Sequence, residues 1–177
     1  MSETFDVVPE TKDWTWVLER TCLECGFGAG TVSPHEIGQR VRAAATEWEL
    51  VLLRPDARNR PRPDVWSPLE YACHVRDVFR VYDRRLQRML DEDNPGFQNW
   101  DQDETAISER YDRQDPPRVS VELSADGDVI ANRFDTVSGD QWRRRGDRSD
   151  GSAFTIDSLG RYFIHDVLHH LWDVRVP

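Results

Sequence analysis

Residues 66–74 read Trp-Ser-Pro-Leu-Glu-Tyr-Ala-Cys-His, and this stretch decides the fold class. Ser67 suits the position before a helix, proline suits the first helical residue, and Glu70 stands where it closes a capping box. The residues that follow repeat at helical spacing on one face: Tyr71, His74, Val75, Val78, Tyr82, Leu86 and Met89. The sequence therefore predicts an amphipathic helix that runs to about residue 92, with His74 on its buried face.

Three further segments carry similar signals. Residues 33–36 (Ser-Pro-His-Glu) repeat the capping box and predict a helix that ends at Pro55. A third helix is predicted from the Asp-Pro-Pro at 115–117 to Gly139, with a kink or break at 126–128, where Asp-Gly-Asp is poor helix sequence. A fourth is predicted from the cap at Thr155 to about Val174 and is apolar on a wide arc. Four such helices predict an all-α four-helix bundle.

The segments outside these helices are of three kinds. Residues 1–32 contain two tryptophans and a glycine-rich turn, which predicts an irregular N-terminal arm packed on a bundle of residues 33–177. Residues 93–115 form a long connection between the second and third helices, and such a connection is usually functional or carries a short helix. Its Trp100, with Asp101 and Asp103, either covers a site as a lid or anchors the loop. Residues 143–154 predict a short hairpin or an ordered turn.

Length and charge exclude several classes of protein. The 177 residues suit one domain, and the formal net charge of −10 opposes the basic surface that nucleic-acid binding needs. No run of 18 apolar residues occurs, so no transmembrane helix is expected. The acidic residues 1–10 do not resemble a signal peptide, which favours a cytoplasmic protein. We therefore expect neither a nucleic-acid partner nor a membrane partner.

Three histidines suggest a metal site. His165 and His169 are four residues apart, so they stack on one face of the fourth helix, and His74 faces the interior from the second helix. Imidazoles suit zinc or nickel, and three of them leave a position open on the ion. The alternative is that each histidine is a hydrogen-bonded core residue. Buried imidazoles without a partner would cost free energy, which favours a shared ligand.

Two motifs of this chain resemble those of the DinB/YfiT-like family of four-helix bundles. They are residues 66–74, where a capped helix start precedes a histidine, and residues 163–170 (Phe-Ile-His-Asp-Val-Leu-His-His). The resemblance covers roughly residues 33 to 174. It implies that His74, His165 and His169 bind one divalent transition metal. His170 faces about 100° away from the neighbouring histidine by helix geometry, and it is left out of this set.

Other side chains could support such a site. Ligand histidines usually donate their second N–H to a carboxylate, and Asp166, Asp77 and Glu70 are the candidates for this role. Surface exposure, or helix capping for Glu70, is the competing interpretation. Tyr71 and Tyr162 lie about one turn from the histidines, where they either line a pocket or pack in the core.

The three cysteines pose a separate question. Cys22 and Cys25, followed by glycine, have the spacing of half a zinc knuckle, which needs two more ligands. Cys73, His35 or a second subunit could supply them. The competing interpretations are a reduced dithiol that packs in the interior and a redox pair. Cys73 itself is expected to be buried and inert.

The resemblance implies two kinds of function. One is a metal-dependent enzyme acting on a small-molecule substrate with a low-molecular-weight thiol, such as mycothiol or bacillithiol, as in the related mycothiol-dependent maleylpyruvate isomerases. Such an enzyme would be an S-transferase or an isomerase. The other is a non-catalytic, metal-binding stress-response module that serves as a sensor or as half of a homodimer. A metal-dependent hydrolase is the further alternative, because an open metal site can also activate water.

Overall fold

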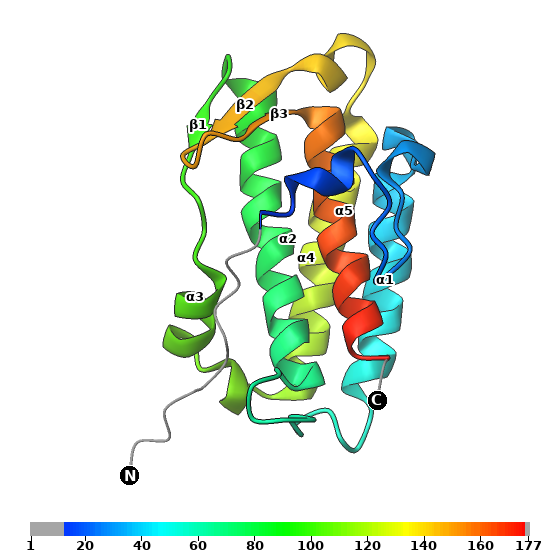
Figure 1. Ribbon diagram of the computed structural model, residues 1–177, viewed down its shortest axis with the longest axis vertical. Helices are drawn as coiled ribbons and strands as arrows, with labels where there is room; N and C mark the ends of the chain where they lie inside the picture. Colours follow the sequence, from blue (N-terminus) through cyan, green and yellow to red (C-terminus); the bar gives the residue numbers. More distant parts are fainter. Residues whose placement is uncertain (1–12, 176–177) are drawn as a thin grey trace.

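Four long helices build the molecule. The computed structural model describes residues 13–175. The helices are α1 (Ile37–Leu52), α2 (Pro68–Asp91), α4 (Pro116–Thr136) and α5 (Ile156–Asp173). They pack side by side as a bundle in which α4 and α5 separate α1 from α2, although α1 and α2 are successive in the chain (Figure 1). The predicted all-α four-helix bundle is confirmed.

Three of the four long helices begin with a side-chain cap, and at the start of α4 the Asp115 carboxylate accepts a hydrogen bond from the Arg118 N–H. Ser67 and Thr155 each form a capping box, at the starts of α2 and α5. The capping box predicted at residues 33–36 is wrong. Ser33 makes no capping hydrogen bond, Pro34–Glu36 forms a short 3-10 turn, and the Glu36 carboxylate instead accepts a hydrogen bond from Arg40. The helix proper therefore begins only at Ile37.

The interior of the bundle is aromatic. Phe163 of α5 is fully buried, and its ring stacks on Phe134 of α4 with centroids 5.8 Å apart. Phe79 of α2 meets the Phe163 ring edge-on, with centroids 6.0 Å apart. At Gly127, where a break was expected, α4 runs on without interruption. A Cβ added there would stand 3.1 Å from Phe79, so the glycine lets two helices approach closely.

A small sheet closes one end of the bundle (Figure 1). Strand β2 (Arg145–Arg148) pairs antiparallel with β3 (Ala153–Thr155), which confirms the predicted hairpin. It also pairs parallel with β1 (Gly96–Phe97), which lies in the long connection after α2. The same connection carries the short helix α3 (Gln102–Ser108), capped by Asp101, and α3 packs against α2. The connection is thereby fixed along one side of the bundle.

The N-terminal segment from residue 13 packs on α5 through two 3-10 turns, η1 (Thr15–Leu18) and η2 (Ala29–Thr31). Cys22 and Phe27 of this segment are buried against the bundle. Residues 1–12 of the predicted arm lie outside the described residues. Among residues 13–175, no helix combines the length and the apolarity that crossing a bilayer requires.

Candidate metal centre

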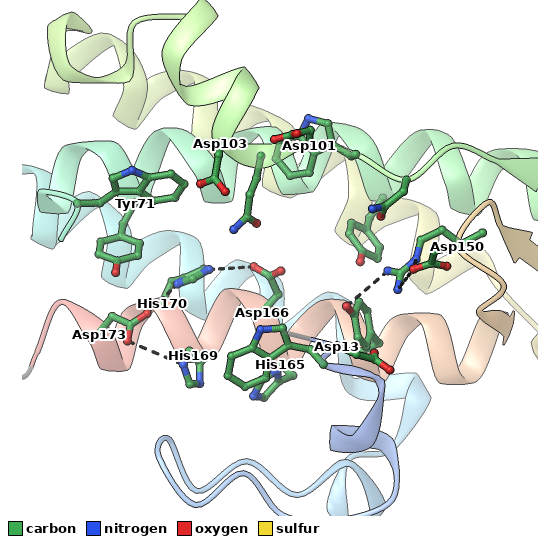
Figure 2. A pocket seen from close by; sticks show the side chains of 18 of the residues that line it. Asp13, Tyr71, Asp101, Asp103, Asp150, His165, Asp166, His169, His170 and Asp173 are labelled. Atoms are coloured by element: carbon green, nitrogen blue, oxygen red, sulfur yellow. Dashed lines mark hydrogen bonds and ion pairs between the residues drawn. The ribbon is translucent and has the colours of Figure 1, made fainter. Parts of the chain in front are cut away.

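The predicted metal ligands are divided between two faces of α5. His165 and His169 lie with Cys22 and Cys25, whereas His74 lies with Asp166 and His170. Figure 2 shows Asp166 and His170 on one side of α5, and His165 and His169 on the other, facing the N-terminal segment. Among the described residues, the structure does not place His74 in one cluster with His165 and His169. Ligation of one ion by these three histidines therefore stays a prediction.

The helical repeat explains this division. Positions 165 and 169 form one i, i+4 pair, and positions 166 and 170 form a second pair rotated by about 100°. The second pair faces α2, and the first faces the N-terminal segment. The spacing of the two histidines predicted one pair, but Asp166 and His170 have the same spacing. An aspartate followed four residues later by a histidine was the signal that could have found them.

The cluster of His74, Asp166 and His170 has the dimensions of a metal site. The Asp166 Oδ1 atom lies 3.3 Å from His74 Nε2 and 3.4 Å from His170 Nε2. Ligand atoms around a tetrahedral zinc ion, at bond lengths of about 2.0–2.1 Å, stand roughly 3.3–3.4 Å apart. Two imidazoles and a carboxylate are also the donor set of many catalytic zinc and ferrous sites. The residues therefore fit a divalent transition metal.

The protonation states suit such an ion. Burial lowers the pKa of His74, so its ring is neutral at pH 7 and can offer a nitrogen lone pair. Burial would raise the pKa of Asp166, but its hydrogen bond with His74 and the nearby imidazoles outweigh this and bring the pKa to about 2. Asp166 is thus an ionised carboxylate at neutral pH, and its negative charge favours cation binding.

Neighbouring side chains hold the three ligands in place. The Nδ1 atom of His170 lies 2.8 Å from Asp173 Oδ2, which directs the opposite nitrogen, Nε2, toward Asp166. Trp100 stacks on the His74 ring with an interplanar angle of 4° and a centroid distance of 5.4 Å. Tyr71 packs against His170 at 5.1 Å. The long connection thus forms a wall of the site. This agrees with the first role predicted for Trp100, in which it covers a site.

The predicted supporting carboxylates have different roles. Asp166 belongs to the cluster itself. Asp77 accepts hydrogen bonds from Arg76 and Arg80 of its own helix and from Tyr111 of the 3-10 turn η4 (Tyr111–Arg113). Glu70 closes the capping box of α2 and pairs with Arg60. The carboxylate that accepts the second N–H of a cluster histidine is instead Asp173, which was not predicted for this role.

A cavity of about 900 Å³ opens over the cluster. It lies between α5, the long connection and the N-terminal segment (Figure 2). Tyr71 and Tyr162 both line this cavity, so the first of their two predicted roles, lining a pocket, is the one observed. Burial raises the pKa of Tyr162, so its hydroxyl keeps its proton at neutral pH. The volume suits a ligand of drug size.

The cavity wall is acidic. Arg148 is ion-paired with Asp150 at 2.8 Å, and Arg85 donates a hydrogen bond to the Gln98 carbonyl. These two are the arginines of the described lining, whereas the carboxylates that line it number eight: Asp13, Glu24, Asp64, Asp101, Asp103, Asp150, Asp166 and Asp173. The surplus of carboxylates disfavours anionic ligands and favours hydroxyl-rich or cationic ones.

The cysteines lie away from this cavity lining. Burial raises the pKa of Cys73 to about 12, in agreement with the expected buried, inert residue. Burial also raises the pKa of Cys25 to about 11. Cys73 and His35 were expected as possible partners of the Cys22 and Cys25 pair, but neither belongs to its cluster. His35 instead meets the Trp142 ring edge-on at 5.3 Å, and His165 and His169 stand next to the cysteines.

Comparison with known proteins gives the class that this fold and site define. The model of the DinB superfamily matches residues 39–174, most of the chain, so the chain belongs to this superfamily. Among solved structures, YfiT from Bacillus subtilis is similar with a TM-score of 0.70 and 16% identity, over 81% of this chain and 88% of that chain. YfiT is described as a probable metal-dependent hydrolase with an unusual four-helix bundle topology. At this identity the likeness shows the shared fold. No curated protein matches the chain.

Asp173 should control metal affinity from outside the ligand set. We expect Asp173→Asn to weaken zinc binding at the cluster by roughly 10- to 100-fold, because the amide no longer accepts a full charge-assisted hydrogen bond from His170 Nδ1. Competition with a chromogenic chelator measures the affinity. Asp140→Asn, at an exposed position in a turn, is the matched control and should leave it unchanged. Equal affinities of the two variants would show that Asp173 does not support the ligand.

Proposed function

We propose that this chain is a metal-dependent enzyme that binds a divalent transition metal, with zinc or nickel as the favoured ions, through His74, Asp166 and His170. The observation that carries this proposal is the meeting of three ligand atoms from α2 and α5, all within 4.8 Å of one another, at the cavity. Three protein ligands leave coordination positions for a substrate, which is the arrangement of catalytic rather than structural metal sites.

We further propose a low-molecular-weight thiol as the co-substrate, in an S-transfer or isomerisation reaction. Among the described residues, no cysteine belongs to the cluster of His74, Asp166 and His170, so a sulfur ligand would have to come from outside. The metal, when bound, supplies a positive charge that favours the deprotonated form of a thiol or of water. The chain's own groups then determine which molecule enters.

The acidic cavity wall selects among thiols. Mycothiol is an uncharged, hydroxyl-rich pseudo-disaccharide apart from its thiol, whereas glutathione and bacillithiol carry carboxylates. Carboxylates such as Asp101 and Asp103 can accept hydrogen bonds from sugar-like hydroxyls and repel anions. The protonated hydroxyl of Tyr162, also in the lining, can donate a hydrogen bond, while Trp100 holds the His74 ring in place. These features support mycothiol over the other two.

Calorimetric titration of the zinc-loaded protein tests the thiol proposal. We expect mycothiol to bind at least about tenfold more tightly than glutathione or bacillithiol, a difference of about 1.4 kcal/mol. His170→Ala should abolish the binding. His35→Ala, a histidine substitution outside the cavity lining, should preserve it. Equal binding of all three thiols would contradict selection by the acidic wall.

Hydrolysis is the second candidate, because YfiT is described as a probable metal-dependent hydrolase. It would use the same cluster, with water in place of the thiol. The same titration distinguishes the two reactions. If the zinc-loaded protein binds none of the three thiols, even at millimolar concentration, the transferase proposal fails and the hydrolase is preferred.

A further inference from the structure

Four further metal-binding side chains meet on the other face of α5. Cys22, Cys25, His165 and His169 each offer one ligand atom, and these four atoms all lie within 4.8 Å of one another. Cys22 Sγ is 3.7 Å from His169 Nδ1. In a tetrahedral zinc site, with bonds of about 2.3 Å to sulfur and 2.0–2.1 Å to nitrogen, ligand atoms stand roughly 3.3–3.8 Å apart. The cluster therefore has nearly the dimensions of a complete site.

The backbone turn around the two cysteines favours this arrangement. The Cys22 N–H donates to the Phe27 carbonyl at 2.8 Å, and the Gly26 N–H donates to the Cys22 carbonyl at 2.9 Å. Gly26 has φ = +77°, a conformation that residues with a Cβ seldom adopt. The chain thus reverses directly after Cys25, and both thiols remain beside α5.

His169 is oriented as a ligand with a supporting carboxylate. Its Nδ1 faces Cys22, whereas its Nε2 lies 3.3 Å from Glu24 Oε2 and 3.8 Å from Asp173 Oδ1. A carboxylate on Nε2 favours the tautomer with its proton there, which leaves the lone pair of Nδ1 for a metal. Ligand histidines in zinc proteins commonly have such a partner.

Aromatic rings pack around the cluster, Cys25 is partly buried, and His165 and His169 also line one edge of the cavity. Cys22, His165 and His169 are all at least 93% buried. The Trp14 ring lies 5.4 Å from the His165 ring and 4.9 Å from the His169 ring, and Phe27 packs against His165 at 5.3 Å. Four protein ligands fill the tetrahedral positions of a zinc ion and leave none for a substrate, which is typical of structural zinc.

We propose that Cys22, Cys25, His165 and His169 bind a structural zinc ion that fastens the N-terminal segment to α5. Both cysteines bind as thiolates, so two protons pass to the solvent, and Zn²⁺ with two thiolates and two neutral imidazoles carries no net charge. A neutral centre suits a buried position. Fastening this segment also fixes part of the cavity wall, because Trp14 and Glu24 of the segment line the cavity.

Cobalt substitution of the full chain, without any added thiol, tests this proposal. We expect a thiolate-to-cobalt charge-transfer band, which disappears in the double variant Cys22→Ser, Cys25→Ser. The band should persist in Cys73→Ala, the matched cysteine control, and in His170→Ala, which removes a ligand of the cavity cluster but none of these four. Elemental analysis should find about two zinc ions per chain in the wild type and about one in the double variant.

A second measurement does not depend on the folding of a variant. Modifying the thiols of the zinc-loaded wild type with a mercurial, in the presence of a zinc indicator, should release one ion and leave the other bound. Absence of the charge-transfer band from the wild type, or its persistence in the double variant, would overturn the proposal. So would a Cys22–Cys25 disulfide found by mass spectrometry in protein purified without an oxidant, because it would show a redox pair.

Discussion

Asp166→Asn and His170→Ala are each expected to lose the metal ion of the cavity cluster and to lower turnover by more than about 100-fold. Substitutions of groups that only support a ligand already cost roughly 10- to 100-fold in affinity or activity, so removing a ligand should cost more. Asparagine keeps the shape of Asp166 but loses the negative charge that lies within 3.4 Å of both imidazole nitrogens. The ion would then lack its one anionic protein ligand.

Elemental analysis and steady-state kinetics together measure this effect. His35→Ala is the matched control, since its ring packs on Trp142 and lies outside the cavity lining. Circular dichroism should show the same helical content in all variants, because the hydrophobic core does not depend on the cluster. An Asp166→Asn variant with full metal content and full activity would show that the cluster is not the metal centre.

The second large effect concerns stability. Phe163→Ala is expected to lower the free energy of unfolding by about 3–5 kcal/mol, because it removes a fully buried ring from the centre of the bundle and leaves a cavity there. The ring contacts Phe134, Phe79 and Tyr82, so all three lose a packing partner. A domain of ordinary stability has only about 5–15 kcal/mol in total.

Urea denaturation followed by circular dichroism measures this loss. Leu53→Ala removes an apolar side chain that is 80% exposed, so it should change stability by less than about 0.5 kcal/mol. A comparable, small change for Phe163→Ala would contradict a close-packed interior at the contact of α2, α4 and α5.

The helices were predictable because their signals are local. The capping box at Ser67 and the cap at Thr155 need only residues within one turn, and both formed as predicted, with Ser158 completing a capping box at Thr155. Ser33 carries the same pattern and does not cap, since the chain there takes a 3-10 turn before α1. Gly127 looked like a break, but the close approach of Phe79 gives the glycine a packing role inside an unbroken helix.

The site was predictable only in part because it depends on how α5 is rotated against its neighbours. Spacing identified His165 and His169 as a pair, but it could not say whether that pair faces α2 or the N-terminal segment. In the structure the pair that faces α2 is Asp166 and His170, which cluster with His74. The meeting of Cys22 with His169 joins residues 147 positions apart, a contact that no local pattern contains.

Anomalous diffraction at the zinc edge, from crystals of the zinc-loaded chain, tests most directly whether His74, Asp166 and His170 bind a metal ion. We predict a peak within about 2.0–2.2 Å of His74 Nε2, a carboxylate oxygen of Asp166 and His170 Nε2. An absent peak at this position, or an ion bound jointly by His74, His165 and His169, would contradict it.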